Sequence, residues 1–114
     1  MNIEEFRNYC LSKKGATESL PFGDDTLVFK VGNKMFALAG LQDFKFANLK
    51  CDPEKAMEYR ETFHGIKPGW HMSKKHWNSV YIDSDVTNQL FFELIDDSYN
   101  LIVKSLTKKV RESL

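Results

Sequence analysis

The sequence has few cysteines, no long apolar run and no net charge, and each of these absences argues against a class of protein. Its two cysteines, Cys10 and Cys51, are too few for a disulfide framework and show no metal-binding spacing. No apolar segment approaches the ~20 residues that a membrane-spanning helix requires. Glu4 and Glu5 stand where a secretory signal would carry basic residues. We therefore expect a cytoplasmic protein with reduced, buried cysteines and no membrane association.

Charge is balanced overall but is unevenly distributed along the chain. Sixteen basic residues match sixteen acids, whereas domains that bind nucleic acid are usually basic. Residues 26–50 hold four lysines against one aspartate, and residues 62–82 hold three lysines and no acid. Residues 83–103 hold five acids and no lysine or arginine. Whether a basic surface exists therefore depends on where these segments lie in space.

Size and composition predict a single α+β domain over residues 1–114. The chain is 42% hydrophobic and has nine phenylalanines, enough for one core. Capping residues and apolar spacing predict helices over residues 3–14, 53–63 and 86–106, the last with a bend at Asp96-Asp97-Ser98. Alternation predicts strands over residues 44–49 and 77–82, and a short extended piece over 17–22. Residues 66–76 are expected to be irregular, and the tail from about residue 107 is expected to be loose.

A hairpin centred on Gly32-Asn33 is the clearest local signal. Two apolar strands, residues 27–31 and 34–38, flank this dipeptide, which readily adopts the positive φ angles of a two-residue turn. The register of such a turn places Leu27, Phe29 and Val31 opposite Leu38, Phe36 and Lys34. The predicted order is α-β-β-β-β-α-β-α, with helices packed on one face of an antiparallel sheet.

Several segments, taken in order, resemble the MmcQ/YjbR family over nearly the whole chain. They are Pro21-Phe22-Gly23, the hairpin from Phe29 to Ala37, Leu49-Lys50-Cys51-Asp52-Pro53, Pro68-Gly69-Trp70-His71-Met72, His76-Trp77 with Val80, and Ser98-Tyr99. The resemblance implies a curved antiparallel sheet backed by helices and related to the CyaY/frataxin fold. Members are described as DNA-binding proteins with a "double wing" of protruding hairpins or loops. The resemblance therefore implies DNA as the partner.

Basic and aromatic residues are interleaved between the second helix and the last strand. Lysines neutralise phosphates, and an exposed tryptophan or histidine ring stacks on a base. The turn at Pro68-Gly69 would project this stretch as one wing, and its candidate residues are Lys67, Trp70, His71, Lys74, Lys75 and His76. A plainer interpretation competes with each of them. Trp70 fits core and surface equally well, Trp77 fits the core better, and the lysines also fit ordinary solvated charges.

Lys30 and Lys34 flank the hairpin turn and form the second candidate wing, although lysines beside a turn are also ordinary solubilising residues. Lys45 and Lys50 would extend a positive face if their side chains point outward. No helix presents the Arg, Asn or Gln pattern that reads base edges. The first hypothesis is therefore a small DNA-binding protein that contacts the phosphate backbone with little sequence specificity.

Neither a metal site, a cofactor nor catalysis is expected. The spacing of His64, His71 and His76 matches no zinc signature. The sequence has no nucleophile motif, phosphate-binding glycine loop or dinucleotide fingerprint. The alternative hypothesis is a non-enzymatic adaptor that binds a protein or a small ligand on the sheet face. One contiguous positive face would favour DNA, and positive spots separated by acids would favour the adaptor.

Overall fold

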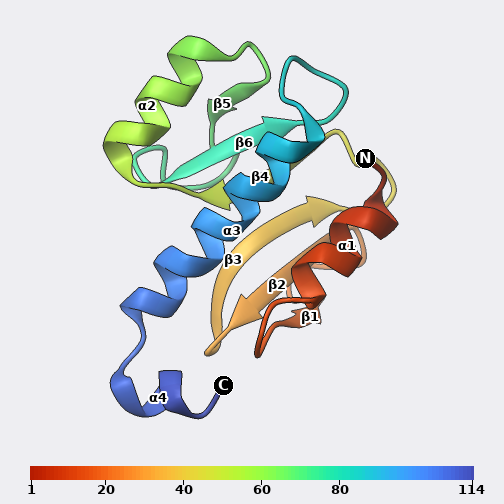
Figure 1. Cartoon of the computed structure of the whole chain (residues 1–114). Coiled ribbons are helices and arrows are strands. Elements are labelled where there is room, and N and C mark those ends of the chain that lie inside the picture. Colours follow the sequence, from red (N-terminus) through yellow and green to blue (C-terminus); the bar gives the residue numbers. More distant parts are fainter.

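The protein is built from one antiparallel sheet and four helices, three of which cover one face of the sheet (Figure 1). The computed structural model describes all residues, 1–114. The strands are β1 (Thr17–Ser19), β2 (Thr26–Val31), β3 (Lys34–Gly40), β4 (Phe46–Lys50), β5 (Ile66–Pro68) and β6 (Trp77–Tyr81). The helices are α1 (Ile3–Leu11), α2 (Pro53–Thr62), α3 (Asn88–Ser105) and α4 (Lys108–Glu112). The strand order is β1-β2-β3-β4-β6-β5, which confirms the predicted α+β class; the relation to the CyaY/frataxin fold stays a prediction.

The helices begin where capping side chains accept hydrogen bonds from the first turn. Asn2 Oδ1 accepts from Glu5 N at 2.8 Å, and Asp52 Oδ2 accepts from Lys55 N at 3.3 Å, as the sequence predicts. α1 ends at Leu11, earlier than expected, because the chain turns there toward Gly15, whose φ is +74°. None of the four helices is both long and apolar enough to cross a lipid bilayer.

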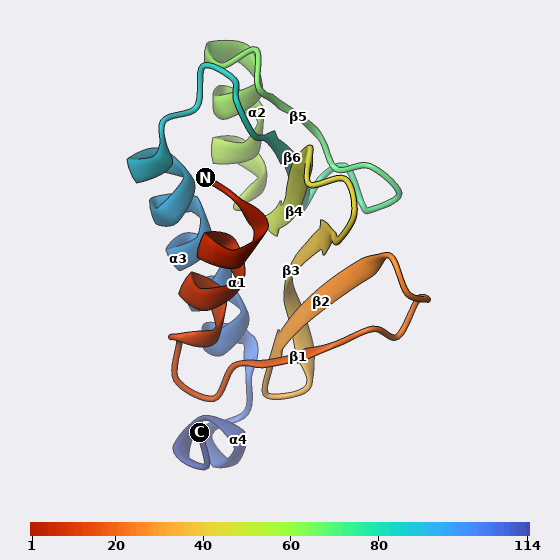
Figure 2. The same ribbon diagram turned by 90° about the vertical axis from the view of Figure 1, so that its right-hand side faces the viewer.

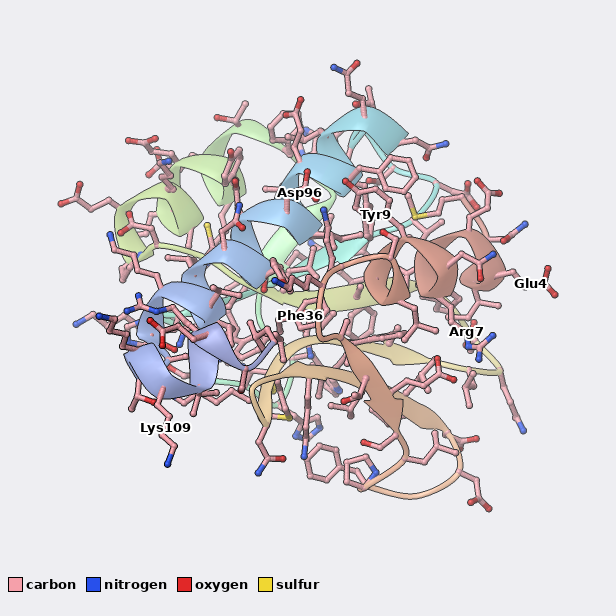
Figure 3. All side chains as sticks on the ribbon, turned by 60° about the horizontal axis from the view of Figure 1, so that its bottom comes forward. Glu4, Arg7, Tyr9, Phe36, Asp96 and Lys109 are labelled. Atoms are coloured by element: carbon pink, nitrogen blue, oxygen red, sulfur yellow. The ribbon has the colours of Figure 1, made fainter.

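The main core lies between the sheet and the helices. Phe6 of α1 is fully buried and meets Phe29 of β2 edge to face, with the ring centroids 5.6 Å apart. Ile95 of α3 is fully buried in the same cluster. At the surface, Tyr9 Oη donates to Asp96 Oδ1 at 2.6 Å, which ties α1 to α3 (Figure 3). These contacts fix both helices on one face of the sheet.

The opposite face of the sheet, here called the outer face, is partly apolar. Alternate side chains of a strand point to opposite faces. Val28, Leu38 and Trp77 form a second, smaller cluster there, with Met35 packed against it. The central strand β3 is therefore apolar on both faces. Trp77 lies in this cluster, as the preferred interpretation of its sequence predicts.

The turn of the β2–β3 hairpin forms as predicted, but the predicted register is wrong beyond it. Val31 pairs with Lys34, whereas Phe29 pairs with Ala37 because a β-bulge shifts the ladder after Lys30. Leu27 accordingly lies opposite Ala39, a residue on from the predicted Leu38. A two-residue turn fixes only the first pairs of a hairpin, and the extra residue in β3 changes all later ones.

The bulge is stabilised by Ser98 of α3. The buried Oγ of Ser98 donates to Phe36 O at 2.5 Å and accepts from Lys50 N at 2.8 Å. It thereby satisfies a carbonyl at the bulge and an amide at the end of β4. α3 runs unbroken from Asn88 to Ser105, so the bend expected at Asp96-Asp97-Ser98 does not occur.

Two segments are more regular than the sequence predicts. Residues Ile66–Pro68, expected to be irregular, form the edge strand β5 and pair with β6. The tail, expected to be loose, forms α4 after a cap in which Thr107 Oγ1 accepts from Val110 N at 3.3 Å. A Cβ on Gly32 would lie 3.1 Å from Val110 Cγ1, so α4 packs directly on the hairpin turn. Apolar side chains at helical spacing explain why the tail is folded.

Candidate binding site on the outer face of the sheet

Two loops extend beyond the outer face, on the side away from α1, α2 and α3 (Figure 2). One joins β1 to β2 and carries Phe22, and the other joins β5 to β6 and carries Trp70. Both aromatic side chains face solvent, with exposed fractions of 65% for Phe22 and 62% for Trp70. Exposed large apolar side chains that gather on one face can mark a binding surface. The two loops therefore mark the outer face as the candidate site.

A pocket of about 470 Å³ lies between these loops. This volume is within the range of about 300–1,000 Å³ that ligand pockets usually have. The outer faces of β3 and β4 form part of the lining, and the loops supply the rest. The lining residues are Phe22, Thr26, Met35, Leu38, Ala39, Gly40, Asp43, Phe46, Asn48, Trp70, His71 and Met72. The pocket is mostly apolar, with a few polar groups at defined positions.

The loop that carries Trp70 is fastened to the sheet by two buried polar side chains. Asn48 Nδ2 donates to Trp70 O at 3.0 Å, and Ser79 Oγ accepts from Trp70 N at 2.9 Å. Ser79 Oγ also donates to Asn48 Oδ1 at 2.6 Å. The backbone N–H and C=O groups of Trp70 are therefore both hydrogen-bonded, while its indole ring stays exposed. Such a ring is pre-organised for contact with a ligand.

The ammonium group of Lys74 is engaged within its own loop. Lys74 Nζ donates to Gly69 O at 2.5 Å, and the carbonyl oxygen of Lys74 accepts from Arg60 of α2. Arg60 also donates through Nε to Asn78 Oδ1 at 2.6 Å. The part of the predicted wing around Lys74 is thus a closed turn, and Lys74 contributes to its structure.

The other predicted residues of this segment lie on the protein surface. The side chains of Lys67, Lys75 and His76 are exposed, and none of them takes part in an ion pair. His71 is also exposed, and its ring meets that of Trp70 edge to face with centroids 4.7 Å apart. Lys67 lies in the edge strand β5, and the residues from Trp70 to His76 lie in the loop that joins β5 to β6.

The turn of the β2–β3 hairpin is covered on one side, whereas Lys30 beside it pairs with the pocket residue Met35. Lys34 Nζ donates to Ser105 Oγ at 3.4 Å, and α4 packs on the turn at Gly32. The hairpin tip is therefore no freely projecting element, and the second loop that extends beyond the outer face is instead the one from β1 to β2. That loop carries Asp24 and Asp25 in place of lysines.

The charged strand residues of the outer face have one sign. Residues that pair directly across two antiparallel strands point to the same face. Lys50 pairs with Trp77 and Lys30 pairs with Met35, and both partners belong to the outer-face cluster. Both lysines therefore point to the outer face. The sequence alone did not decide this orientation for Lys50.

Lys67 extends this pattern to the edge of the sheet. It pairs with Ser79, whose hydroxyl lies on the outer face beside Asn48. The single acid in the six strands is Glu18, which accepts hydrogen bonds from Arg7 of α1, on the helix side, at distances down to 2.7 Å. Acids near the pocket are confined to loops, where Asp43 lines it and pairs with Lys45 at 3.3 Å.

The titratable groups away from the pocket have structural surroundings. Burial is the main cause that raises the pKa of the Cys51 thiol to about 11, and burial also raises the pKa of Cys10. A thiol with a raised pKa is a poor nucleophile at neutral pH. Hydrogen bonds from the backbone of Gly65 and His64 lower the pKa of Asp85. No group of three or more His, Cys, Asp or Glu side chains is placed to hold a metal ion.

Sequence reasoning missed most of the pocket. Leu38 was expected on the same face as Phe29 and Phe36 but lies in the outer-face cluster, and Met35 was assigned no role. Two signals were present in the sequence. The run from Met35 to Ala39 is apolar at every position, and Asn48 is a polar residue in the middle of an apolar strand. Phe22 belonged to the family resemblance but was given no functional role.

Comparison with known proteins places the chain in a family. The YjbR family model matches residues 11–101. The Escherichia coli protein YbdF is 46% identical over 90 residues, which cover 78% of this chain and 74% of YbdF. The Escherichia coli protein YjbR is 30% identical over 115 residues, which cover 100% of this chain and 98% of that protein. A crystal structure of a Deinococcus radiodurans protein with the DUF419 domain has a TM-score of 0.92 at 37% identity, covering 98% of this chain and 86% of that one. The chain therefore belongs to the YjbR family.

Proposed function

We propose that this protein binds DNA, without enzymatic activity, across the outer face of its sheet. Lysines would contact the phosphates, and the exposed aromatic rings beside the pocket would add contacts only where a base is unpaired. Because no helix presents residues suited to base edges, little sequence specificity is expected. The proposal keeps the function that the family resemblance implies and moves its site from two projecting wings to the sheet face.

The observation that carries the proposal is the single sign of charge on the strands of the outer face. Lys30, Lys50 and Lys67 point to this face, and no strand places an acid there. Lysines that point to one face of a sheet can follow a phosphate backbone. The net charge of the whole chain, which is zero, does not describe this face because most acids lie on the helices and their connections.

Loop residues define where the DNA backbone would run. Lys75 is exposed on the loop that carries Trp70 and adds a positive charge, whereas Lys74 is held by Gly69 O. Asp24 and Asp25 on the β1–β2 loop would repel phosphates. The phosphate backbone would therefore follow the strand lysines and Lys75 and avoid the β1–β2 loop.

Fluorescence anisotropy of a labelled, mixed-sequence duplex tests the proposal, with titrations at about 50 and 200 mM salt, where phosphate contacts lose most affinity. We expect saturable binding that weakens steeply with salt. A variant with Lys67→Glu and Lys75→Glu should bind more weakly at the lower salt, and its dependence on salt should fall by about two units of slope, since two phosphate contacts are lost.

A matched variant controls for net charge. Lys14→Glu with Lys55→Glu changes the charge by the same amount, but at exposed positions after α1 and on α2. This control should bind DNA nearly as the unmodified protein does. Equal losses in the two variants would show that only overall charge matters, and the absence of any binding by folded protein at the lower salt would overturn the proposal.

The pocket favours a second candidate, the non-enzymatic adaptor that takes a protein segment or a small ligand on the sheet face. Its apolar lining and the acids Asp24, Asp25 and Asp43 on one side of it are the observations in favour. If the protein is such an adaptor, the double variant Lys67→Glu with Lys75→Glu should still bind the partner. The variant Trp70→Ala should not bind it. Failure of the folded protein to bind DNA would favour this candidate.

A further inference from the structure

We propose that the pocket between Phe22 and Trp70 accepts an unpaired nucleobase, so that the protein prefers single-stranded DNA to duplex. This inference rests on the proposed DNA-binding function and adds a second, separable recognition element to it. The lysines would supply affinity for any phosphate backbone. The pocket would distinguish a free base from a paired one.

Flat and polarisable side chains surround the opening of the pocket. Phe22 and Trp70 stand on the two loops that enclose it, and Met35 and Met72 add thioether groups. Aromatic rings stack on the face of any nucleobase, and thioethers pack well against ring systems. Because the backbone of Trp70 is fixed by Asn48 and Ser79, the indole ring projects from a fixed position at the pocket.

Polar groups within the pocket suit the edge of a heteroaromatic ring. Asn48 lines the pocket, and its amide has a second N–H besides the one that it donates to Trp70 O. Asp43 supplies an acceptor, and Thr26 supplies a hydroxyl that both donates and accepts. An alkyl chain would leave these groups without partners, whereas a base carries donors and acceptors on its edge.

The pocket lining contains one acid, Asp43, and no lysine or arginine, whereas lysines stand on the strands of the same face. Lys30 pairs with the pocket residue Met35, and Lys50 lies on the same face. Lys75 is exposed on the loop that carries Trp70. A base attached to a phosphate backbone satisfies both the pocket and these lysines. Bases within a duplex are stacked and paired, so their faces cannot enter a pocket without being extruded.

The test compares labelled oligothymidylate with a duplex that presents the same number of phosphates. We expect tighter binding to the single strand. Trp70→Ala should weaken binding to the single strand by roughly tenfold, in line with the stacking contribution of one base, and should leave binding to the duplex unchanged. Trp70→Phe should restore most of the loss because a phenyl ring still stacks. Met57→Ala removes another exposed apolar side chain, 60% exposed on α2, and should change neither affinity.

The outcomes separate this inference from the proposed function. If Trp70→Ala leaves single-strand binding intact while Lys67→Glu with Lys75→Glu weakens both DNA forms, the base pocket is wrong and DNA binding stands. If Trp70→Ala weakens binding to the single strand and to the duplex equally, the pocket does not select unpaired bases and the inference is overturned. Circular dichroism of each variant confirms that the fold is retained.

A separate titration with thymidine monophosphate identifies the source of the base. Trp70 and Trp77 are the only tryptophans, and Trp77 is 9% exposed, so fluorescence quenching by a ligand reports mainly on Trp70. Quenching that saturates with the mononucleotide and is lost in Asn48→Ala supports the base pocket even if longer DNA is not bound, with free nucleotides as the source. Failure of both the mononucleotide and the oligothymidylate to quench would overturn the inference.

Discussion

The side-chain amide of Asn48 donates a hydrogen bond to the carbonyl oxygen of Trp70 at 3.0 Å, which joins the middle of β4 to the loop between β5 and β6. Asn48 is 6% exposed, and its own oxygen accepts from Ser79. A buried polar side chain is retained at low cost only when its hydrogen bonds are made. This pair therefore orders the loop that carries the most exposed tryptophan.

Asn48→Ala should release the loop between β5 and β6. Removing the amide leaves the hydroxyl proton of Ser79 without its acceptor and the carbonyl of Trp70 without its donor, which costs about 1–3 kcal/mol in unfolding free energy. Trypsin should cleave after Lys74 or Lys75 faster than in the unmodified protein, as followed by mass spectrometry. Asn100→Ala, an exposed change on α3, provides the control and should leave the cleavage rate unchanged.

Ser98→Ala should destabilise the whole domain more than a typical surface change. Both Phe36 O and Lys50 N lose their buried partner, so we expect a loss of about 2–4 kcal/mol in the free energy of unfolding. Chemical denaturation with urea measures it. Ser105→Ala, the matched change at the exposed end of the same helix, should cost much less. Equal costs for the two serines would contradict the role assigned to Ser98.

Asp85 should make the stability depend on pH in the acidic range. Its carboxylate accepts from Gly65 N at 2.7 Å and from His64 N at 2.8 Å, which lowers its pKa in the folded state. A lowered pKa contributes stability that is present above the unfolded value of about 3.9 and is lost as the pH falls through the folded value.

Asp85→Asn therefore gives a specific comparison. The difference in Tm between the unmodified protein and this variant should be larger at about pH 6 than at about pH 3, because the unmodified protein loses the carboxylate's contribution on acidification. Asp83→Asn, which alters a carboxylate that accepts no hydrogen bond, should show the same difference at both pH values. A pH-independent difference for Asp85→Asn would contradict the assignment.

Both cysteines should resist modification while the protein is folded. Cys10 is completely buried, and burial raises the pKa of Cys51 to about 11, so neither thiol forms much thiolate near pH 8. A colorimetric thiol reagent should react with two thiols after denaturation and react slowly before it. Rapid reaction of one thiol in the native protein would indicate that its surroundings open frequently.

Two neighbouring lysines should behave differently if the protein binds DNA as proposed. Lys75→Ala should reduce the slope of log affinity against log salt by about 0.9, as for one phosphate contact. Lys74→Ala should leave that slope unchanged and instead increase tryptic cleavage of the loop, because Lys74 Nζ is bonded to Gly69 O. The paired titrations separate a binding role from a structural one.

Local signals in the sequence predicted most of the fold. The caps at Asn2 and Asp52, the turn at Gly32-Asn33 and the strand from Trp77 were recognisable because each depends on neighbours within a few residues. The bulge at Phe36 could not be predicted, since its carbonyl is satisfied by Ser98, sixty-two positions away. Distant partners decide register and bulges, and one sequence does not reveal them.

The candidate site was predicted in part for the same reason. The segment from Lys67 to His76 was singled out by its composition, and its role in binding stays a prediction. The pocket was not predicted, because it joins Phe22 to Trp70 across the sheet and depends on the outward side of β3 and β4. The hydrogen bond from Lys74 to Gly69 O could not be predicted from the charge pattern either, since it depends on the geometry of the turn.

The packing of α4 on the hairpin turn has a consequence for the order in which the protein folds. Gly32 touches Leu106 and Val110, which follow the hairpin in the chain only after all the other strands and α3. The hairpin itself is local and forms early, but packing of α4 on its turn requires closure of a long loop, which is slow. The tip of the hairpin is therefore expected to be the last part of the sheet to gain protection from hydrogen exchange, and a chain that ends before Leu106 would leave it open to solvent.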